Sequence, residues 1–275
     1  MTTPLTSLTV GTGKVGARVA RRLEHLGVAH RIGSRARRPA FDWTDASTWA
    51  PFVAGSTRVF VTYVPDLGFP GAADTMAAFG EVCATEGVTN VVLLSGRGEP
   101  GAVLGEQALA RTAGPITVVR CAWFDQNFSE SFLLQPVLDG VIALPAGDVE
   151  EPFIDADDIA DVVVACLSEP DAHLGNTYEL TGPELLGFDD VARILSDVTG
   201  RSIAYLPVEV DDYAAAAVDA GLPAADAHAY AELFHSITDG RNAHLTPDVD
   251  KVLGRPPTTF ERFATTTAAS GIWDR

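Results

Sequence analysis

The stretch Leu5–Val19, which reads Leu-Thr-Ser-Leu-Thr-Val-Gly-Thr-Gly-Lys-Val-Gly-Ala-Arg-Val, decides the fold. A short apolar run ends at Val10, and Gly11, Gly13 and Gly16 then form the pattern G-x-G-x-x-G. The residues that follow carry apolar side chains at helical spacing, which predicts a strand, a glycine turn and a helix in that order. Such a turn lets the backbone approach a pyrophosphate, and the free N–H groups of the helix N-terminus bind it. The sequence therefore predicts a dinucleotide-binding turn, with a purely structural glycine turn as the alternative.

Composition limits the class of protein. The chain has 275 residues, 47% of them apolar, which is enough for one large α/β domain with a smaller appendage. Its net charge of −18 would repel the phosphates of nucleic acid. No apolar stretch approaches the ~20 residues that span a bilayer, and no secretory signal is recognisable. The three cysteines have no metal-ligand spacing and suit a reducing compartment. We therefore expect a cytoplasmic protein without a metal, a membrane anchor or a nucleic-acid partner.

The end of the second predicted strand, over 28–34, carries arginine where a dinucleotide fold often carries an acid. An acidic residue about 20 positions after the glycines binds the ribose hydroxyls of NAD. This chain has no Asp or Glu between Glu24 and Asp42, and it offers Ser34, Arg35 and Arg38 instead. Because arginine pairs well with phosphate, the sequence predicts NADP(H), preferred over NAD. A solvated basic loop is the alternative.

Strands and helices alternate through the first two thirds of the chain. We predict strands over 41–43, 58–64, 88–94, 116–121 and 177–180, and helices over 76–86, 102–112 and 155–167. This order predicts an α/β, Rossmann-like, doubly wound and mostly parallel sheet. From residue 188 onward the pattern is helical apart from one strand over 202–206, which predicts a small, mainly helical C-terminal substrate lid. The predicted domains are 1–182, a Rossmann domain whose segment 123–153 contributes to the substrate pocket, and 183–275, the lid.

Five ordered motifs resemble the NmrA-like family of atypical short-chain dehydrogenases/reductases. They are Gly-Thr-Gly-Lys-Val-Gly at 11–16, Arg-Cys-Ala-Trp-Phe-Asp-Gln-Asn-Phe at 120–128, Pro-Phe-Ile-Asp-Ala-Asp-Asp-Ile-Ala at 152–160, Tyr-Glu-Leu-Thr-Gly-Pro-Glu at 178–184 and Leu-Gly-Arg-Pro-Pro-Thr-Thr-Phe at 253–260. Within the family, the chain is most similar to the agroclavine-dehydrogenase and festuclavine-synthase type, which reduces an iminium. The family also contains cofactor-sensing regulators, so the resemblance specifies the fold better than the activity.

The resemblance implies a set of cofactor-binding positions. The pyrophosphate would lie on Gly11, Thr12, Gly13, Lys14, Val15 and Gly16, and the adenosine phosphate on Ser34 and Arg35, next to Arg38. The adenosine and ribose would lie along Thr62, Tyr63 and Val64. The nicotinamide would be lined by Ser95, Gly96, Cys121, Ala122, Trp123 and Phe124.

The catalytic pair of typical short-chain reductases, Tyr-x-x-x-Lys, is absent. Lys14 and Lys251 are the only lysines, and neither stands four residues after a tyrosine. Hydride transfer would therefore proceed without the usual acid. An iminium substrate needs no proton at that step; otherwise Glu99, Glu106 or a water held by Ser95 would donate one. The alternatives without a catalytic or binding role are that Glu106 is an acid on the helix surface and that Arg97 pairs with Glu99.

Aromatic residues interleaved with amides after residue 122 predict a pocket for a flat apolar ligand. The predicted substrate-binding residues are Arg97, Trp123, Phe124, Asn127, Phe128, Tyr230 and Phe234. We predict an NADP(H)-dependent oxidoreductase that reduces a small organic substrate such as an imine or iminium, an enone or a quinone. The alternatives are a redox-sensing regulator that acts through a protein partner, and a cofactor-scaffolded isomerase or cyclase. The sequence is compatible with a homodimer and does not fix the oligomeric state.

Overall fold

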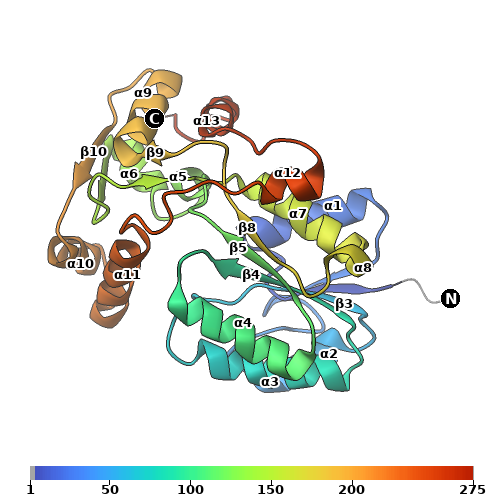
Figure 1. Ribbon diagram of the computed structural model, residues 1–275. Helices are drawn as coiled ribbons and strands as arrows, with labels where there is room; N and C mark the ends of the chain where they lie inside the picture. Colours follow the sequence, from blue (N-terminus) through green and yellow to red (C-terminus); the bar gives the residue numbers. More distant parts are fainter. Residues whose placement is uncertain (1–3, 275) are drawn as a thin grey trace. The chain divides into compact units, whose positions relative to one another are not determined.

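The computed structural model describes residues 4–274, which divide into two compact units (Figure 1). The first unit contains the described residues up to 121 together with 156–180 and 247–255. The second contains 122–155, 181–246 and the described residues from 256 onward. Each unit is thus assembled from three separate segments, whereas the sequence suggested a single boundary between residues 182 and 183.

A six-stranded parallel sheet forms the centre of the first unit. Its strands are β1 (Thr6–Leu8), β2 (His30–Ile32), β3 (Arg58–Val61), β4 (Asn90–Gly96), β5 (Thr117–Cys121) and β8 (Thr177–Leu180). Their order is β2-β1-β3-β4-β5-β8, which confirms the predicted doubly wound sheet. The chain winds in opposite directions from β1 and β3, so the carboxyl ends of these two strands mark the switch point where ligands bind in such folds.

Helices cover both faces of this sheet (Figure 1). One face carries α1 (Lys14–His25) and α7 (Ala156–Ser168), and the other carries α3 (Ala72–Thr85) and α4 (Pro100–Ala113). The shorter elements are the 3₁₀ turn η1 (Ala46–Thr48), α2 (Trp49–Val53), α8 (Pro170–His173) and α12 (Asp248–Leu253). The apolar residues of α3 and α4 pack on β3 and β4 and make a core of their own.

The segment 41–43 is an aromatic part of that core and not a strand, so the strand predicted there is wrong. The N–H of Phe41 donates to the Ser34 carbonyl at 3.1 Å, which closes the loop after β2. The Phe41 ring lies 4.8 Å from that of Phe52, and the Trp43 ring lies 5.0 Å from that of Phe79. Side-chain packing, and not a strand ladder, holds this segment, which enters a turn at Trp43.

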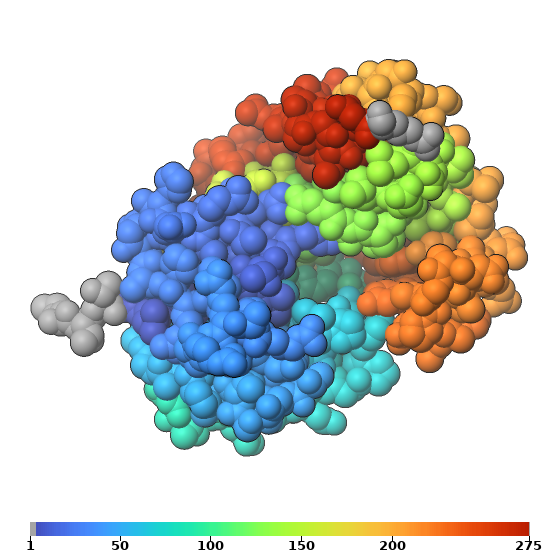
Figure 2. All heavy atoms as spheres, turned by 180° about the vertical axis from the view of Figure 1, so that it is seen from behind, coloured from blue at the N-terminus to red at the C-terminus, as the bar shows by residue number. Residues whose placement is uncertain are grey.

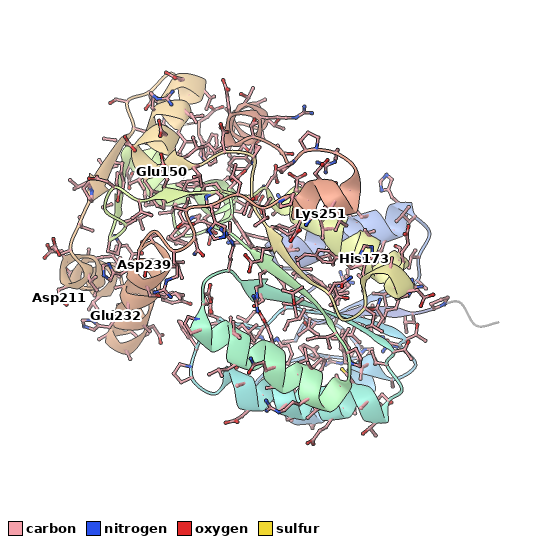
Figure 3. The ribbon with its side chains drawn as sticks, viewed as in Figure 1. Glu150, His173, Asp211, Glu232, Asp239 and Lys251 are labelled. Atoms are coloured by element: carbon pink, nitrogen blue, oxygen red, sulfur yellow. The ribbon has the colours of Figure 1, made fainter. Side chains whose placement is uncertain are left out.

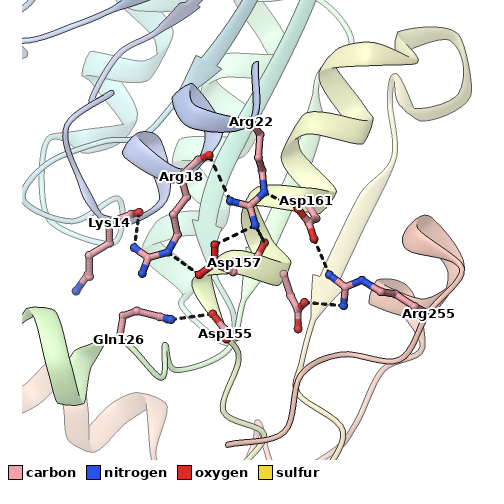
Figure 4. A network of polar contacts seen from close by, with 9 residues as sticks. Lys14, Arg18, Arg22, Gln126, Asp155, Asp157, Asp161 and Arg255 are labelled. Atoms are coloured by element: carbon pink, nitrogen blue, oxygen red, sulfur yellow. Dashed lines mark hydrogen bonds and ion pairs between the residues drawn. The ribbon is translucent and has the colours of Figure 1, made fainter. Parts of the chain in front are cut away.

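Ion pairs join distant segments of the first unit (Figure 4). Arg18 Nε lies 3.1 Å from Asp157 Oδ2, and Arg22 Nη2 lies 2.9 Å from Asp157 Oδ1. Asp161 binds Arg22 Nε at 2.5 Å and Arg255 Nη2 at 2.6 Å. The acids that begin α7 therefore connect α1 to the segment that contains α12.

The second unit is built from two small sheets and a set of helices. β6 (Val141–Leu144) pairs in parallel with β10 (Ala204–Pro207), and β7 (Glu150–Glu151) pairs antiparallel with β9 (Leu186–Gly187). The helices are α5 (Asn127–Glu130), α6 (Leu134–Asp139), α9 (Phe188–Thr199), α10 (Val210–Asp219), α11 (Ala224–Ile237) and α13 (Phe260–Ala268). The prediction that the C-terminal third is mainly helical is thereby confirmed.

Aromatic residues fill the core of the second unit. The rings of Phe128, Phe153 and Phe260 lie within 6 Å of one another. Figure 2 shows the C-terminal segment (red) against the segment that follows β5 (yellow-green), and Trp273 Nε1 donates to the Phe128 carbonyl at 2.9 Å. The end of the chain is therefore part of this core.

Acidic side chains stand on α10, on α11 and in the turn after α11. Figure 3 labels Asp211, Glu232 and Asp239 in this region. Asp239 pairs with Arg241 at 2.6 Å, and these hydrogen bonds lower the pKa of the Asp239 carboxyl to about 2. Within residues 4–274, none of the helices has the length and apolar character needed to cross a membrane, and no cluster of His, Cys, Asp or Glu has metal-site geometry.

Candidate functional site

The glycine-rich turn between β1 and α1 has the tight geometry that the sequence predicted. A Cβ on Gly16 would lie 2.1 Å from the Val10 carbonyl oxygen, and one on Gly11 would lie 2.7 Å from Ile32 Cγ2. Only glycine fits at these two positions, because the neighbouring atoms belong to the turn itself and to β2. The N-cap of α1 is Gly13, whose extended backbone brings no side chain over the helix end. Among the described residues, no side chain caps the N-terminus of α1, and such an uncapped helix end fits a pyrophosphate.

The loop after β2 presents arginines to solvent. Ser34 closes the loop by accepting hydrogen bonds from the N–H groups of Phe41 and Arg37, at 3.1 and 3.4 Å. Arg35 and Arg38, by contrast, have exposed side chains. This part of the chain fits a phosphate on the ribose of a dinucleotide.

Arg31, in contrast to these arginines, has a structural role. Its guanidinium donates to the carbonyls of Phe52 and Ala54. It therefore ties β2 to the end of α2, and it does not belong to the basic loop.

The end of β3 is held at the switch point by two residues that the sequence analysis missed. The Thr9 hydroxyl accepts the Thr62 N–H at 2.9 Å and donates to the Thr62 carbonyl at 3.1 Å. Trp43 Nε1 donates to the same carbonyl at 2.9 Å, and its ring lies 5.2 Å from that of Tyr63. The Thr62 hydroxyl oxygen is buried and has no hydrogen-bond partner among residues 4–274. A buried hydroxyl without a partner at a switch point fits a site that a ligand completes. Val64, the last of the three positions predicted to lie along the adenosine and ribose, is half exposed.

A polar network spans the carboxyl ends of β4, β5 and β8. Ser95, Arg120 and Glu179 stand opposite one another in the sheet register, so their side chains share one face. Glu106, which lies in α4, accepts a hydrogen bond from the Ser95 hydroxyl at 2.6 Å and another from Arg120 Nη2 at 2.7 Å. Arg97, with a side chain only 2% exposed, donates to Glu179 at 3.1 Å. The hydrogen bonds that Arg120 donates to Glu106, together with the charge of Glu106, raise the pKa of Arg120 despite partial burial.

This network assigns definite partners to three predicted site residues. Glu106 is a buried anion in an ion pair, and the Ser95 hydroxyl is committed to it. Arg97 pairs with Glu179 and not with Glu99, which was the plain alternative for it. The sequence contained no local signal for these pairs, because their members lie in separate elements that only the folded chain brings together.

Glu99 has a different environment from Glu106. It is the N-cap of α4, and its carboxyl packs so closely on Gly96 that a Cβ there would lie 2.0 Å from Glu99 Oε1. A Cβ on Gly68 would lie 3.0 Å from Glu99 Oε2 and 3.2 Å from Asp66 Oδ1, so the two acids meet over this glycine. Burial, followed by the charge of Asp66 and a hydrogen bond to it, raises the pKa of Glu99 to about 8. With its pKa raised in this way, the Glu99 carboxyl keeps its proton at neutral pH.

The predicted residues that follow β5 fall into different environments. Cys121 is buried at the end of the strand, and desolvation raises the pKa of its thiol, so it remains protonated. Ala122 is buried as well. Phe124 pairs with Ile154 in an isolated parallel bridge of the second unit.

The other predicted substrate residues also lie in the second unit. Asn127 begins α5, and Phe128 is wholly buried in the aromatic core, which is a structural position. Trp123, Tyr230 and Phe234 belong to one aromatic group, in which the Phe234 ring lies 5.3 Å from Trp123 and 6.1 Å from Tyr230. The structure therefore brings these three together and places Phe128 in the core behind them.

The chain is similar over nearly its whole length to several oxidoreductases. It is 32% identical to the uncharacterized oxidoreductase YesF of Bacillus subtilis, covering 95% of this chain and 94% of that protein. It is 31% identical to the agroclavine dehydrogenase of Claviceps fusiformis (93% and 94% covered). It is 30% identical to an NAD(P)H azoreductase of Xenophilus azovorans (94% and 96% covered). No protein-family model matches the chain.

Solved structures show the same fold at lower identity. A nucleoside-diphosphate-sugar epimerase from Staphylococcus aureus superposes with a TM-score of 0.82 at 18% identity, covering 95% of this chain and 99% of that one. An NADPH-dependent quinone oxidoreductase from Escherichia coli, solved with NADPH, gives 0.76 at 20% identity with the same coverage. NmrA, a negative transcriptional regulator solved with NAD, gives 0.73 at 14% identity, with 98% of each chain covered.

Proposed function

Because this chain belongs to the NmrA-like family of atypical short-chain dehydrogenases/reductases, we propose that it is an NADP(H)-dependent oxidoreductase. Its substrate is a small organic molecule, and it works without a Tyr-x-x-x-Lys pair. The observation that carries the proposal is the glycine turn before α1, where Gly11 and Gly16 leave room only for backbone and ligand. The names of similar proteins, which include an azoreductase and an agroclavine dehydrogenase, support a reductive activity.

The preference for NADP(H) rests on the loop after β2. Arg35 and Arg38 are exposed there, and no acidic side chain lies between Glu24 and Asp42 to bind the ribose hydroxyls of NAD. Forked guanidinium groups bind a 2′-phosphate through charge-assisted hydrogen bonds. Asp42 lies near Arg35 and does not replace the missing acid, because its carboxylate already accepts hydrogen bonds from Thr44.

Glu99 supplies the proton in this proposal. The bound cofactor provides a hydride, and a neutral carbonyl or imine also requires a proton at the other end of its double bond. The Ser95 hydroxyl donates its hydrogen bond to Glu106. Glu106 in turn forms an ion pair with Arg120, so neither side chain is placed to act as the acid. Glu99, whose pKa is raised to about 8, meets Asp66 near the carboxyl ends of β3 and β4 and keeps its proton at neutral pH. In sheets of this kind ligands bind beyond the carboxyl ends of the strands, which is where an acid is needed.

The proposed substrate residues are the aromatic side chains of the second unit. Trp123, Tyr230 and Phe234 offer ring faces to a flat imine, enone or quinone. Arg97 acts by positioning, because its buried guanidinium is paired with Glu179 and holds the ends of β4 and β8 together.

The test combines cofactor binding with turnover. NADPH and NADH are titrated by calorimetry, and NADPH oxidation is then followed with a cyclic iminium, an enone and a quinone. We expect NADPH to bind more tightly than NADH and to be oxidised by at least one of the three. Tight binding of NADPH without turnover across this panel would favour a cofactor-sensing regulator.

A variant separates the role of Glu99 from that of the cofactor site. Glu99→Gln keeps the shape of the side chain and removes its proton, so we expect NADPH binding to remain and reduction of neutral acceptors to fall by about 10²-fold or more. Reduction of the iminium is expected to survive, because that step consumes no proton. Unchanged reduction of a neutral acceptor in this variant would remove Glu99 from the reaction.

A further inference from the structure

One of the four tryptophans has an indole N–H without an acceptor. Trp43 Nε1 donates to the Thr62 carbonyl, Trp49 Nε1 to the Asp42 carbonyl and Trp273 Nε1 to the Phe128 carbonyl, all at 2.8–2.9 Å. Trp123 Nε1 is buried, in a residue that is 7% exposed, and finds no partner among residues 4–274. Burying a donor without an acceptor costs free energy, and native proteins rarely do so without a reason.

Aromatic rings of the second unit surround this indole. The ring centres of Phe188, Phe234 and Phe132 lie 5.4, 5.3 and 6.2 Å from that of Trp123. A ring system without oxygen or nitrogen offers no acceptor to the indole N–H beyond a weak contact with a π face. Within residues 4–274 the hydrogen bond of this donor is left unmade, and a further molecule with an acceptor atom would satisfy it.

Phe132 occupies the position that such a molecule would take. It lies in the turn between α5 and α6, its side chain is 40% exposed, and it stacks on Phe234 at 5.0 Å with the ring planes only 15° apart. The rings of Trp123 and Phe188, by contrast, meet nearly at right angles, as core aromatics commonly do. An exposed ring stacked flat on a buried one has the geometry of a planar ligand on its platform.

We propose that a planar ligand with a carbonyl oxygen displaces Phe132 from Phe234 and accepts a hydrogen bond from Trp123 Nε1. This inference rests on the proposed reductase and narrows its substrate class. A carbonyl compound such as a quinone or an enone satisfies the buried donor. An iminium has no lone pair to accept this hydrogen bond, and its positive charge opposes the positive end of the N–H dipole. Trp123 is thus the residue that selects carbonyl acceptors over cations of the same shape.

The test reads the indole N–H groups directly and needs no cofactor. Tryptophan labelled with a nitrogen isotope gives one indole cross-peak for each of the four tryptophans in a proton–nitrogen correlation spectrum. The probes are coumarin, which is planar with a carbonyl, and N-methylquinolinium, a planar cation of similar size. We expect coumarin to move the Trp123 resonance downfield and to leave the Trp43, Trp49 and Trp273 resonances in place.

Two variants complete the test. Trp123→Phe keeps an aromatic ring and removes the N–H, so coumarin binding is expected to weaken about tenfold and binding of the cation to stay the same. Phe132→Ala is expected to tighten coumarin binding several-fold, because no ring then competes for Phe234. The three other indole resonances report whether each variant is folded.

Equal binding of the two probes, or an unmoved Trp123 resonance with coumarin bound, would overturn the assignment. These outcomes would leave the reductase intact if NADPH is still oxidised. A chain that shows the predicted shift without binding NADPH would keep the Trp123 donor and lose the proposed function.

Discussion

Replacing Glu99 with glutamine tests whether this side chain carries a proton in the folded state. The fold raises the pKa of Glu99 from its ordinary value of 4.5 to about 8. Between these two values the folded state binds a proton that the unfolded state has released. The stabilisation is therefore complete below the lower value and is lost as the pH rises through the upper one. The slope is at most about 1.4 kcal/mol per pH unit.

The structure sets the size of the effect. Two pH units, from about 5 to about 7, would give at most about 3 kcal/mol at this slope. Glu99 is partly exposed, and water therefore screens its interactions, so we expect about 1–2 kcal/mol of that amount. Between these two pH values, the free energy of unfolding of the wild type should fall by this amount more than that of Glu99→Gln, because the amide of glutamine does not titrate.

The assay is urea unfolding at a series of pH values, with Glu106→Gln as the matched control. Glu106 lies on the same helix and is the partner of Arg120, so its replacement is expected to lower the free energy of unfolding by about 3 kcal/mol at every pH in the range. The charge of Glu106 is the smallest of the causes that raise the pKa of Glu99, so this control should keep most of the wild-type pH slope. Parallel curves for the wild type and Glu99→Gln would show that Glu99 is ionised at neutral pH, and the proton-donor proposal would then fail.

Three further substitutions test the cofactor turn, the basic loop and the strand-end network. Gly16→Ala places a Cβ 2.1 Å from the Val10 carbonyl, so NADPH affinity measured by calorimetry should drop at least about tenfold; unchanged affinity would contradict a binding role for this turn. Arg35→Ser should weaken NADPH about tenfold and leave NADH unaffected, and an equal loss for both cofactors would argue against a phosphate contact. Arg120→Met leaves the buried Glu106 without its ion-pair partner and should cost about 3–5 kcal/mol in urea unfolding; a loss under about 1 kcal/mol would mean that the pair contributes little.

The features that depend on local sequence could be predicted. The glycine turn was recognisable because all its requirements lie close together in the chain: Gly16 is packed against the Val10 carbonyl, and Gly11 against Ile32 of the next strand. The doubly wound parallel sheet followed from the alternation of strands and helices, although the order of its strands did not. The strand predicted over 41–43 failed because aromatic, β-favouring residues there serve ring packing instead of a backbone ladder.

The features that depend on register could not be predicted. In the sequence, Arg120 is a single charged residue in an otherwise mainly apolar strand, and nothing marks it as part of a site. Glu179 belongs to another strand, far along the chain. Only the parallel register places them beside Ser95 and under Glu106. Asp66 was missed for the same reason, since nothing in the sequence indicates that the loop after β3 turns its carboxyl toward Glu99.

Glu99 and Glu106 show how position across the sheet decides the chemistry of an acid. Glu106 lies in the second turn of α4, whereas Glu99 is the N-cap residue before the helix and has an extended backbone. Glu106 forms an ion pair with Arg120 from β5. Glu99 meets Asp66 from the loop after β3, and burial together with the charge of Asp66 raises the pKa of Glu99 to about 8. The strand ends that face α4 thus engage one carboxyl group in an ion pair and leave Glu99 with a proton to give at neutral pH.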